Sequence, residues 1–128
     1  MKLPKPQKYN SSKVKKRLRN KADKLWYEKC KKGKCEVCGN TATQVHHYFY
    51  KSSYGHMRYD EDNGVSLCTS CHFLLHHQDP HRIEDKIVKV RGQKWLDKLK
   101  KKAYAKPKAG YQTIGYYKGV IEELENLN

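Results

Sequence analysis

With 128 residues and a mean hydropathy of −1.05, the chain has the length of one small domain and little apolar material for a core. Its formal net charge of +15 indicates a polyanionic partner, for which nucleic acid is a better candidate than an anionic membrane surface. No apolar run is long enough to span a bilayer, and the basic N-terminus lacks the apolar segment of a secretory signal. We therefore expect a cytoplasmic protein with no membrane partner.

The first basic segment begins at the N-terminus. Residues 1–12 contain Pro4, Pro6 and paired serines, which predict a flexible basic arm. In residues 13–32, apolar side chains recur at helical spacing with lysines and arginines on the other faces, so we expect a basic amphipathic helix. Cys30 continues the apolar stripe, and we interpret it as a buried small hydrophobe in preference to a metal ligand.

The middle of the chain, residues 33–80, has the pattern of a hairpin followed by a helix. The β-branched and aromatic content of residues 42–51 predicts a strand. A polar loop follows and ends in the turn signal Asn63-Gly64, and "VSLC" predicts a short second strand. Residues 69–78 then form an expected helix that must end before Pro80.

The last third of the chain is basic at first and acidic at its end. Residues 81–105 predict a basic helical extension, in which Ile83, Ile87 and Val90 lie at helical spacing and Gly92 marks a break. We expect a linker and an acidic C-terminal helix in residues 106–128, and this helix is a candidate contact in a homodimer.

Two Cys-x-x-Cys pairs predict a structural zinc site formed by Cys35, Cys38, Cys68 and Cys71. Two residues between paired cysteines allow both sulfurs to turn toward one tetrahedral ion. The alternative, four reduced free thiols, would leave these groups without a role near the only plausible core. The segment between the pairs is longer than the roughly 15–20 residues of a simple zinc ribbon, so zinc would fix both ends of an insert.

The histidines form a second cluster. His72 and His76 are four residues apart in the predicted helix, so their imidazoles project from one face and can share an ion. His77 is an alternative to His76, but only one of the two fits that face. His46 and His47 point to opposite sides of a strand, so one can join the metal ligands while the other stays free as a general base.

These residues agree in order and spacing with a known family. Residues 35–77 resemble the HNH endonucleases and their ββα-metal fold, on the two cysteine pairs and on His46, His47, Asn63, His72 and His76. The resemblance implies an α+β protein, in which a ββα-metal core at residues 33–80 is stapled by the four-cysteine zinc site and flanked by basic helices.

The resemblance also implies a role for each polar residue of the array. His47 takes the position of the general base, and Asn63 that of the residue that orients the loop and the base. His46, His72 and His76 take the positions of ligands to one catalytic divalent metal. Since many members have Asp where this chain has His46, its site is richer in nitrogen and suits Zn, Ni, Co or Mn better than Mg.

Shorter segments resemble a narrower group, the phage recombination nucleases of the Rap (NinG) type, which cut branched DNA such as recombination junctions. The matching segments are residues 22–29, 35–39, 46–53, 57–73 and 115–117.

The resemblance to the HNH endonucleases therefore implies a metal-dependent DNA endonuclease that produces 5′-phosphate and 3′-hydroxyl ends. Lys51, Ser52 and Arg58 are candidates for holding DNA phosphate near the cut. Two alternatives stay open, a zinc-stabilised nucleic-acid-binding protein without catalysis and an interaction protein that uses its acidic tail. The binding-only alternative gives His47 no role.

Overall fold

The structure, a computed structural model, describes residues 11–126. Its elements are α1 (Ser11–Cys30), β1 (Gln44–His47), the 3₁₀ turns η1 (Gly55–Met57) and η2 (Glu61–Asn63), β2 (Gly64–Leu67), α2 (Thr69–His77), α3 (Pro80–Arg91), α4 (Gln93–Tyr104) and α5 (Ile114–Asn126). The expected α+β class, with a two-stranded hairpin followed by a helix, is confirmed. Most of the expected N-terminal arm, residues 1–10, lies outside the described residues.

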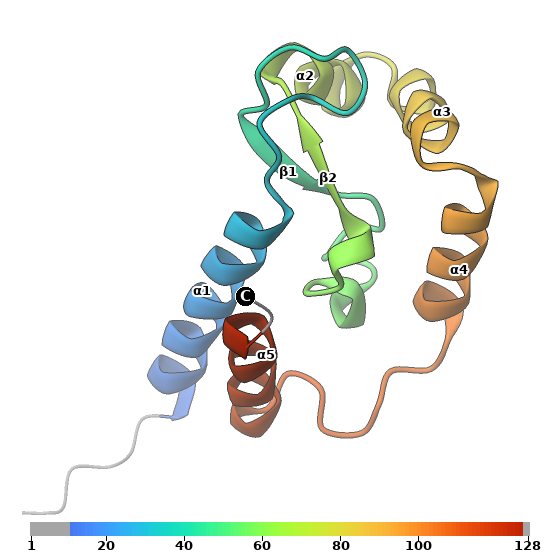
Figure 1. The fold of residues 1–128 in the computed structure, drawn as a ribbon. Coiled ribbons are helices and arrows are strands. Elements are labelled where there is room, and N and C mark those ends of the chain that lie inside the picture. Colours follow the sequence, from blue (N-terminus) through green and yellow to red (C-terminus); the bar gives the residue numbers. More distant parts are fainter. Residues whose placement is uncertain (1–10, 127–128) are drawn as a thin grey trace, which may run out of the picture.

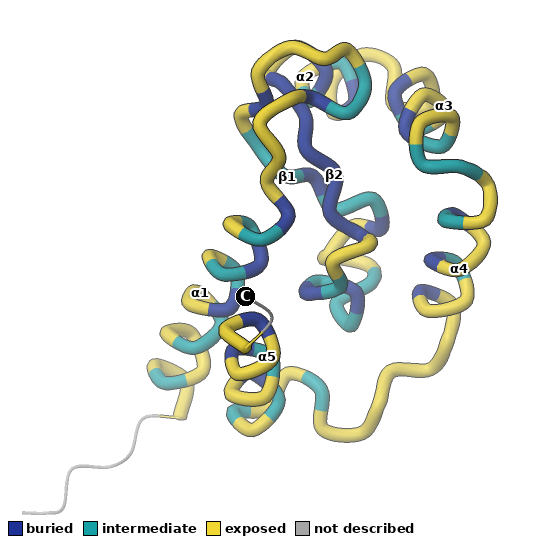
Figure 2. Tube along the Cα trace, viewed as in Figure 1, coloured by how far each residue is buried: buried dark blue, intermediate teal, exposed yellow. Residues whose placement is uncertain are grey.

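The hairpin is the centre of the fold. β1 and β2 pair antiparallel, with His46 opposite Val65 and His47 opposite Gly64. β2 is buried along its whole length, as Figure 2 shows, because helices or loops cover both of its faces. β1 is shorter than the strand predicted for residues 42–51. It ends at His47, opposite the first residue of β2, and beyond that pair the backbone N–H of Tyr48 still donates to the carbonyl of Asn63 at 2.9 Å.

Two helices from opposite ends of the chain pack beside the hairpin. Figure 1 shows α1 and α5 side by side, with α3 and α4 on the other side of the hairpin. The apolar stripe predicted for residues 13–32 does face the protein interior. Its buried members Ala22, Trp26 and Cys30 form one cluster with Tyr117, Ile121 and Leu124 of α5. As expected, Cys30 is a buried small side chain, and burial raises the pKa of its thiol to about 12.

The C-terminal helix starts earlier than the acidic segment. We expected a linker before the acidic end of residues 106–128, but α5 already begins at Ile114. Thr113 provides the reason, because its Oγ1 accepts a hydrogen bond from the backbone N–H of Tyr116 at 3.1 Å and caps the helix there. Since the apolar face of α5 packs on α1, a homodimer contact through this helix would have to use its other faces.

The predicted break at Gly92 separates α3 from α4. Gly92 has a φ of 96°, a backbone conformation that side chains with a Cβ rarely adopt. Ile83 and Ile87 of α3 are buried, whereas Val90 is 58% exposed and does not belong to the buried stripe. Among the described residues, no helix has both the length and the apolar character needed to cross a membrane.

Gly64 marks the place where α1 meets the hairpin. The sequence predicted a turn at this glycine, but it is the first residue of β2 and has an extended φ of −92°. A Cβ at this position would lie 2.8 Å from Sγ of Cys30 and 2.9 Å from Cζ2 of Trp26. The glycine is therefore required for close packing of α1 and not for a turn.

Candidate active site and metal centre

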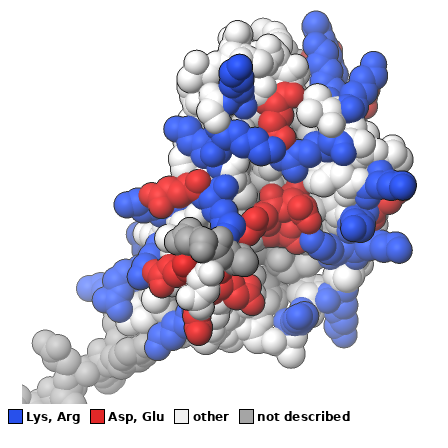
Figure 3. Space-filling view, viewed as in Figure 1, with Lys and Arg blue, Asp and Glu red and all other residues white. Residues whose placement is uncertain are grey.

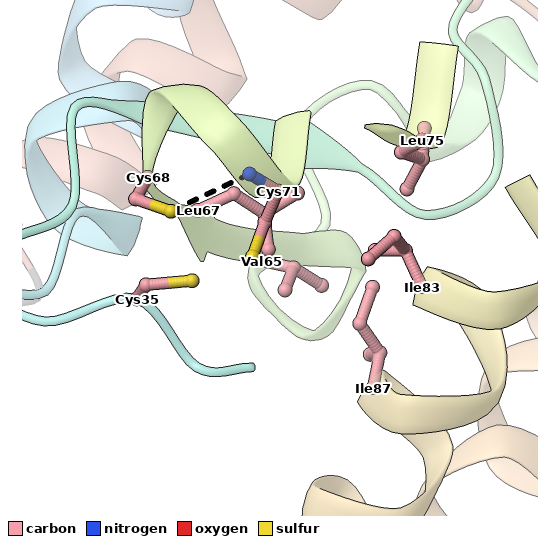
Figure 4. Packing of buried hydrophobic residues seen from close by; sticks show 8 residues of the cluster. All are labelled: Cys35, Val65, Leu67, Cys68, Cys71, Leu75, Ile83 and Ile87. Carbon is pink, nitrogen blue, oxygen red and sulfur yellow. Dashed lines mark hydrogen bonds between the residues drawn. The ribbon is translucent and has the colours of Figure 1, made fainter. Parts of the chain in front are cut away.

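The four cysteines of the predicted zinc site come together. Their sulfur atoms all lie within 4.8 Å of one another, and the Sγ atoms of Cys38 and Cys68 are 3.5 Å apart. Figure 4 shows the sulfurs of Cys35, Cys68 and Cys71 turned toward a common point, with Ile83 of α3 among the apolar residues packed nearby. Four thiols around one point fit a tetrahedral structural zinc ion.

Backbone groups shape this cysteine cluster. The N–H of Gly39 donates to the carbonyl of Cys35 at 3.0 Å, which closes the first knuckle, and the N–H of Cys71 donates to Sγ of Cys68 at 3.4 Å. Burial alone would raise the pKa of Cys35, but backbone N–H groups around its sulfur outweigh burial and lower the pKa to about 7. The thiolate of Cys35 is thus accessible near neutral pH, whereas burial and the neighbouring thiols raise the pKa of Cys71, so zinc binding must displace the proton of that thiol.

An acidic residue inside the first knuckle, Glu36, fixes the cluster to the rest of the fold. Its carboxylate accepts two hydrogen bonds from Arg91 of α3, at 2.7 and 2.9 Å, and one from the backbone N–H of Ser66 at 2.7 Å. Burial would raise the pKa of Glu36, but the Arg91 guanidinium keeps this pKa below its ordinary value. Glu36 and Arg91 are far apart in the chain, so no local pattern in the sequence indicates this contact.

Three histidines form the second cluster: His46 from β1, and His72 and His76 from α2. The ring centroids of His72 and His76 are 4.3 Å apart, and the His46 ring lies 6.1 and 5.2 Å from them. One nitrogen from each ring lies within 4.8 Å of the others. His77 is not part of this group, since its ring packs on Phe73 instead, at 4.9 Å.

The environment of His46 supports a metal-binding role. Its side chain is only 4% exposed, and its Nε2 has no hydrogen-bond partner among the described residues. Burial, with the neighbouring histidines, lowers its pKa to about 3, so the ring is neutral. An unpaired buried nitrogen is costly unless it has a ligand to bind. The imidazoles of His46, His72 and His76 therefore fit a single divalent cation.

His47 lies on the opposite face of β1 and takes no part in this cluster. Its ring stacks on Trp26 of α1, with centroids 4.1 Å apart and planes inclined by 10°. Its Nε2 lies 2.9 Å from the carbonyl oxygen of Arg58. Because a carbonyl oxygen can only accept, Nε2 carries the proton, and Nδ1 is left with a free lone pair. Burial lowers the pKa of His47, which keeps Nδ1 unprotonated at neutral pH.

Asn63 is fully buried and connects the loop to the end of the hairpin. Its Oδ1 accepts from the backbone N–H of Phe49 at 2.7 Å, and its Nδ2 donates to the carbonyls of Phe49 and Met57 at 3.0 and 3.2 Å. An isolated turn residue would not need these bonds. They fix the segment that leads to Arg58, whose carbonyl orients His47.

The three candidate phosphate-binding residues have different surroundings. Lys51 and Ser52 are exposed in the turn after β1. The Arg58 guanidinium instead forms a two-bond ion pair with Asp23 of α1, at 2.7 and 2.6 Å. A phosphate contact from Arg58 would therefore compete with this pair, whereas Lys51 and Ser52 are accessible.

Basic side chains cover much of the surface. In the face shown in Figure 3, Lys and Arg occur over most of the outline, with Asp and Glu interspersed among them. This distribution agrees with contacts to a phosphate backbone along several elements, and it does not form one continuous basic patch on that face.

Comparison with known proteins identifies the central segment. Residues 35–78 match the family model described as HNH endonuclease. Neither the curated proteins nor the solved structures yielded a match to the chain. The matched segment contains the hairpin, α2, the cysteine cluster and the three-histidine cluster, and it confirms the family that the sequence motifs predicted for this region.

Proposed function

Starting from an HNH domain at residues 35–78, which indicates a nuclease or nucleic-acid-binding role, we propose that the protein is a metal-dependent DNA endonuclease. The observation that carries this proposal is the position of His47 beside the three-histidine cluster but outside it. One strand presents His46 to the cluster and His47 to the other side, where its Nδ1 has a free lone pair. A protein that only bound DNA would have no use for this oriented and neutral base.

The cysteine cluster and the three-histidine cluster would bind different ions. Cys35, Cys38, Cys68 and Cys71 would hold a structural zinc ion. His46, His72 and His76 would hold one divalent ion, and three nitrogen donors suit Zn, Ni, Co or Mn better than Mg. When bound, this ion would stabilise negative charge on the scissile phosphate and on the departing 3′ oxygen.

The proton transfer belongs to His47. Its Nδ1 would accept a proton from a water molecule in line with the scissile bond while the water oxygen bonds to phosphorus and the bond to the 3′ oxygen breaks. The products are a 5′-phosphate and a 3′-hydroxyl, which takes up its proton from solvent. The imidazolium would be stabilised by the Arg58 carbonyl at Nε2 and by the Trp26 ring against its face.

Binding of the DNA would depend on its backbone. The exposed Lys51 and Ser52 would contact phosphates near the cut, Arg58 would do so on leaving Asp23, and the lysines of α1 and α4 would extend the surface. We further propose that the preferred substrate is branched DNA, as in the phage recombination nucleases that several segments resemble. Symmetric cleavage of a junction would require two active sites and hence a homodimer. The protein would act in the cytoplasm or nucleoid.

The test compares linear, nicked, flapped and four-way DNA as substrates for wild type and His47→Ala, with Mg, Mn, Ni or Zn added. Wild type is expected to cut, with the highest rate on branched DNA, and His47→Ala to bind with equal affinity but not cut. Binding by both proteins without any cleavage would instead establish the non-catalytic binding function.

A further inference from the structure

A cleft of about 280 Å³ lies next to the three-histidine cluster and has no role in the hydrolysis described above. It is bounded by the segment that follows β1 and by residues of α3 and α4. Tyr50 is the wall shared between the cleft and the cluster. Its ring is stacked at 6.1 Å on His76 and lies edge-on to His46 at 5.6 Å. A group in the cleft would therefore be one aromatic ring away from the metal ligands.

The walls of the cleft are largely aromatic. Phe49 is buried at 9% exposure, and the rings of Tyr54 and Tyr104 meet it edge-to-face at 5.0 and 5.9 Å. In contrast, Tyr50 is 41% and Tyr104 is 65% exposed. Much of the Tyr104 ring is thus open to solvent, although the ring packs against the buried Phe49 ring.

Two charged groups of opposite sign complete the cleft. Glu84 of α3 and Lys100 of α4 line it, and both are half-buried. Neither side chain makes a hydrogen bond or an ion pair with another residue in the described range 11–126. A carboxylate acceptor and an ammonium donor beside aromatic rings are thus available to a ligand with a flat ring, an amino edge and a phosphate.

We propose that this cleft binds one unpaired nucleobase of the DNA strand that is being cut. The base would stack on Tyr104, Lys100 would contact the adjoining phosphate, and Glu84 would accept a hydrogen bond from an exocyclic amino group. This inference rests on the proposed nuclease function and gives it a substrate class. A base inside an intact duplex is stacked and paired and cannot enter the cleft, so flaps, junctions and bulges are favoured.

The experiment uses the full chain carrying His47→Ala, so that binding is measured without cleavage. The probe is a duplex with one unpaired 2-aminopurine, and the reference is the same duplex fully paired. Stacking on Tyr104 should quench the 2-aminopurine fluorescence. Tyr104→Ala should abolish the quenching and weaken binding of the unpaired probe by about 5- to 150-fold, the range found for loss of one stacked base.

Matched variants separate this site from a general loss of binding. Tyr104→Phe keeps the ring and should retain quenching and affinity. Phe73→Ala removes another exposed aromatic ring, 51% exposed on α2 and outside the cleft, and should behave as the parent protein. Glu84→Gln should reduce the preference for bases that carry an amino group over thymine at the unpaired position.

The outcomes distinguish this inference from the nuclease proposal. If Tyr104→Ala weakens paired and unpaired probes equally, or neither, the nucleobase site is wrong, even where wild type cleaves DNA. If quenching depends on Tyr104 but wild type cleaves nothing, the nucleobase site stands and the nuclease proposal fails. Quenching that is instead lost in Phe73→Ala would assign base stacking to α2 and overturn the cleft.

Discussion

The cysteine cluster and the three-histidine cluster share the helix α2 but differ in how closed they are. Cys71 and His72 are neighbours in the chain, yet their side chains belong to different clusters. The cysteine cluster offers four ligands, three of them buried, and packs against Ile83 and Ile87. The histidine cluster offers three, and His76 is exposed. A saturated, buried set of ligands is suited to stability, whereas an incomplete and accessible set leaves a coordination position for substrate.

Loss of the cysteine cluster should have the largest effect. Cys68→Ser is expected to abolish zinc binding and unfold the domain, because structural zinc contributes about 10–16 kcal/mol in small zinc domains and native proteins are stable by only about 5–15 kcal/mol. Zinc content and far-ultraviolet circular dichroism measure both effects. Cys30→Ala is the matched control, since this buried thiol lies outside the cluster and its loss should leave zinc bound. A folded, zinc-free Cys68→Ser protein would contradict the structural role.

Loss of the free histidine should leave the fold and abolish practical activity. His47→Ala is expected to reduce the cleavage rate by roughly 10²–10⁴-fold, the contribution of a general base, with unchanged metal content. His81→Ala, which removes a surface histidine of α3, provides the comparison in a gel assay of plasmid nicking. Retention of the wild-type rate in His47→Ala would mean that another group accepts the proton.

Loss of one histidine of the three-histidine cluster should show most clearly that the two clusters bind separate ions. His76→Ala is expected to weaken binding of the catalytic ion by about 100-fold or more, since even the partners that orient metal ligands contribute 10–100-fold. The structural zinc and the melting temperature should stay near the wild-type values. Titration with Ni or Mn by calorimetry measures this change, and His77→Ala is the adjacent control. Equal weakening by both variants would place the ion elsewhere on α2.

The smallest expected effect is that of the Trp26 ring stacked on His47. Trp26→Leu keeps an apolar side chain in the core but removes the stacked ring, which is worth about 0.5–1.5 kcal/mol, or up to roughly 10-fold in rate. The stability cost of the same change is measured by denaturant unfolding, and the single-turnover cleavage rate is compared at conditions where both proteins are fully folded. Leu25→Ala, a change at the half-buried residue before Trp26 in the same cluster, controls for a general loosening of α1. A rate loss of the same size in Leu25→Ala would mean that the stack has no specific role.

Local patterns in the sequence predicted much of the fold and of the site's membership. Strand alternation separates His46 from His47, and helical spacing joins His72 to His76, so these placements required no knowledge of distant contacts. The same holds for the apolar stripe of α1. Each of these predictions depends on residues close together in the chain.

What could not be predicted depends on long-range packing. Trp26 was correctly placed on a buried stripe, but the stripe does not reveal that the ring meets His47. The Arg91–Glu36 ion pair and the hydrogen bond from His47 to the Arg58 carbonyl likewise join residues that no periodicity connects. Gly64 resembled a turn residue, although its lack of a side chain serves the approach of α1.

Because Trp26 of α1 stacks on His47, the proposed active site extends beyond residues 35–78. Residues 35–78 contain every proposed cysteine and histidine ligand. The ring that stacks on the proposed base His47 comes from α1, and so does Asp23, the ion-pair partner of Arg58. Excision of residues 35–78, or their transfer into another protein, would keep both candidate metal clusters but remove the Trp26 ring that stacks on His47. A minimal portable nuclease should therefore begin upstream of Asp23 and include α5, which holds α1 in place.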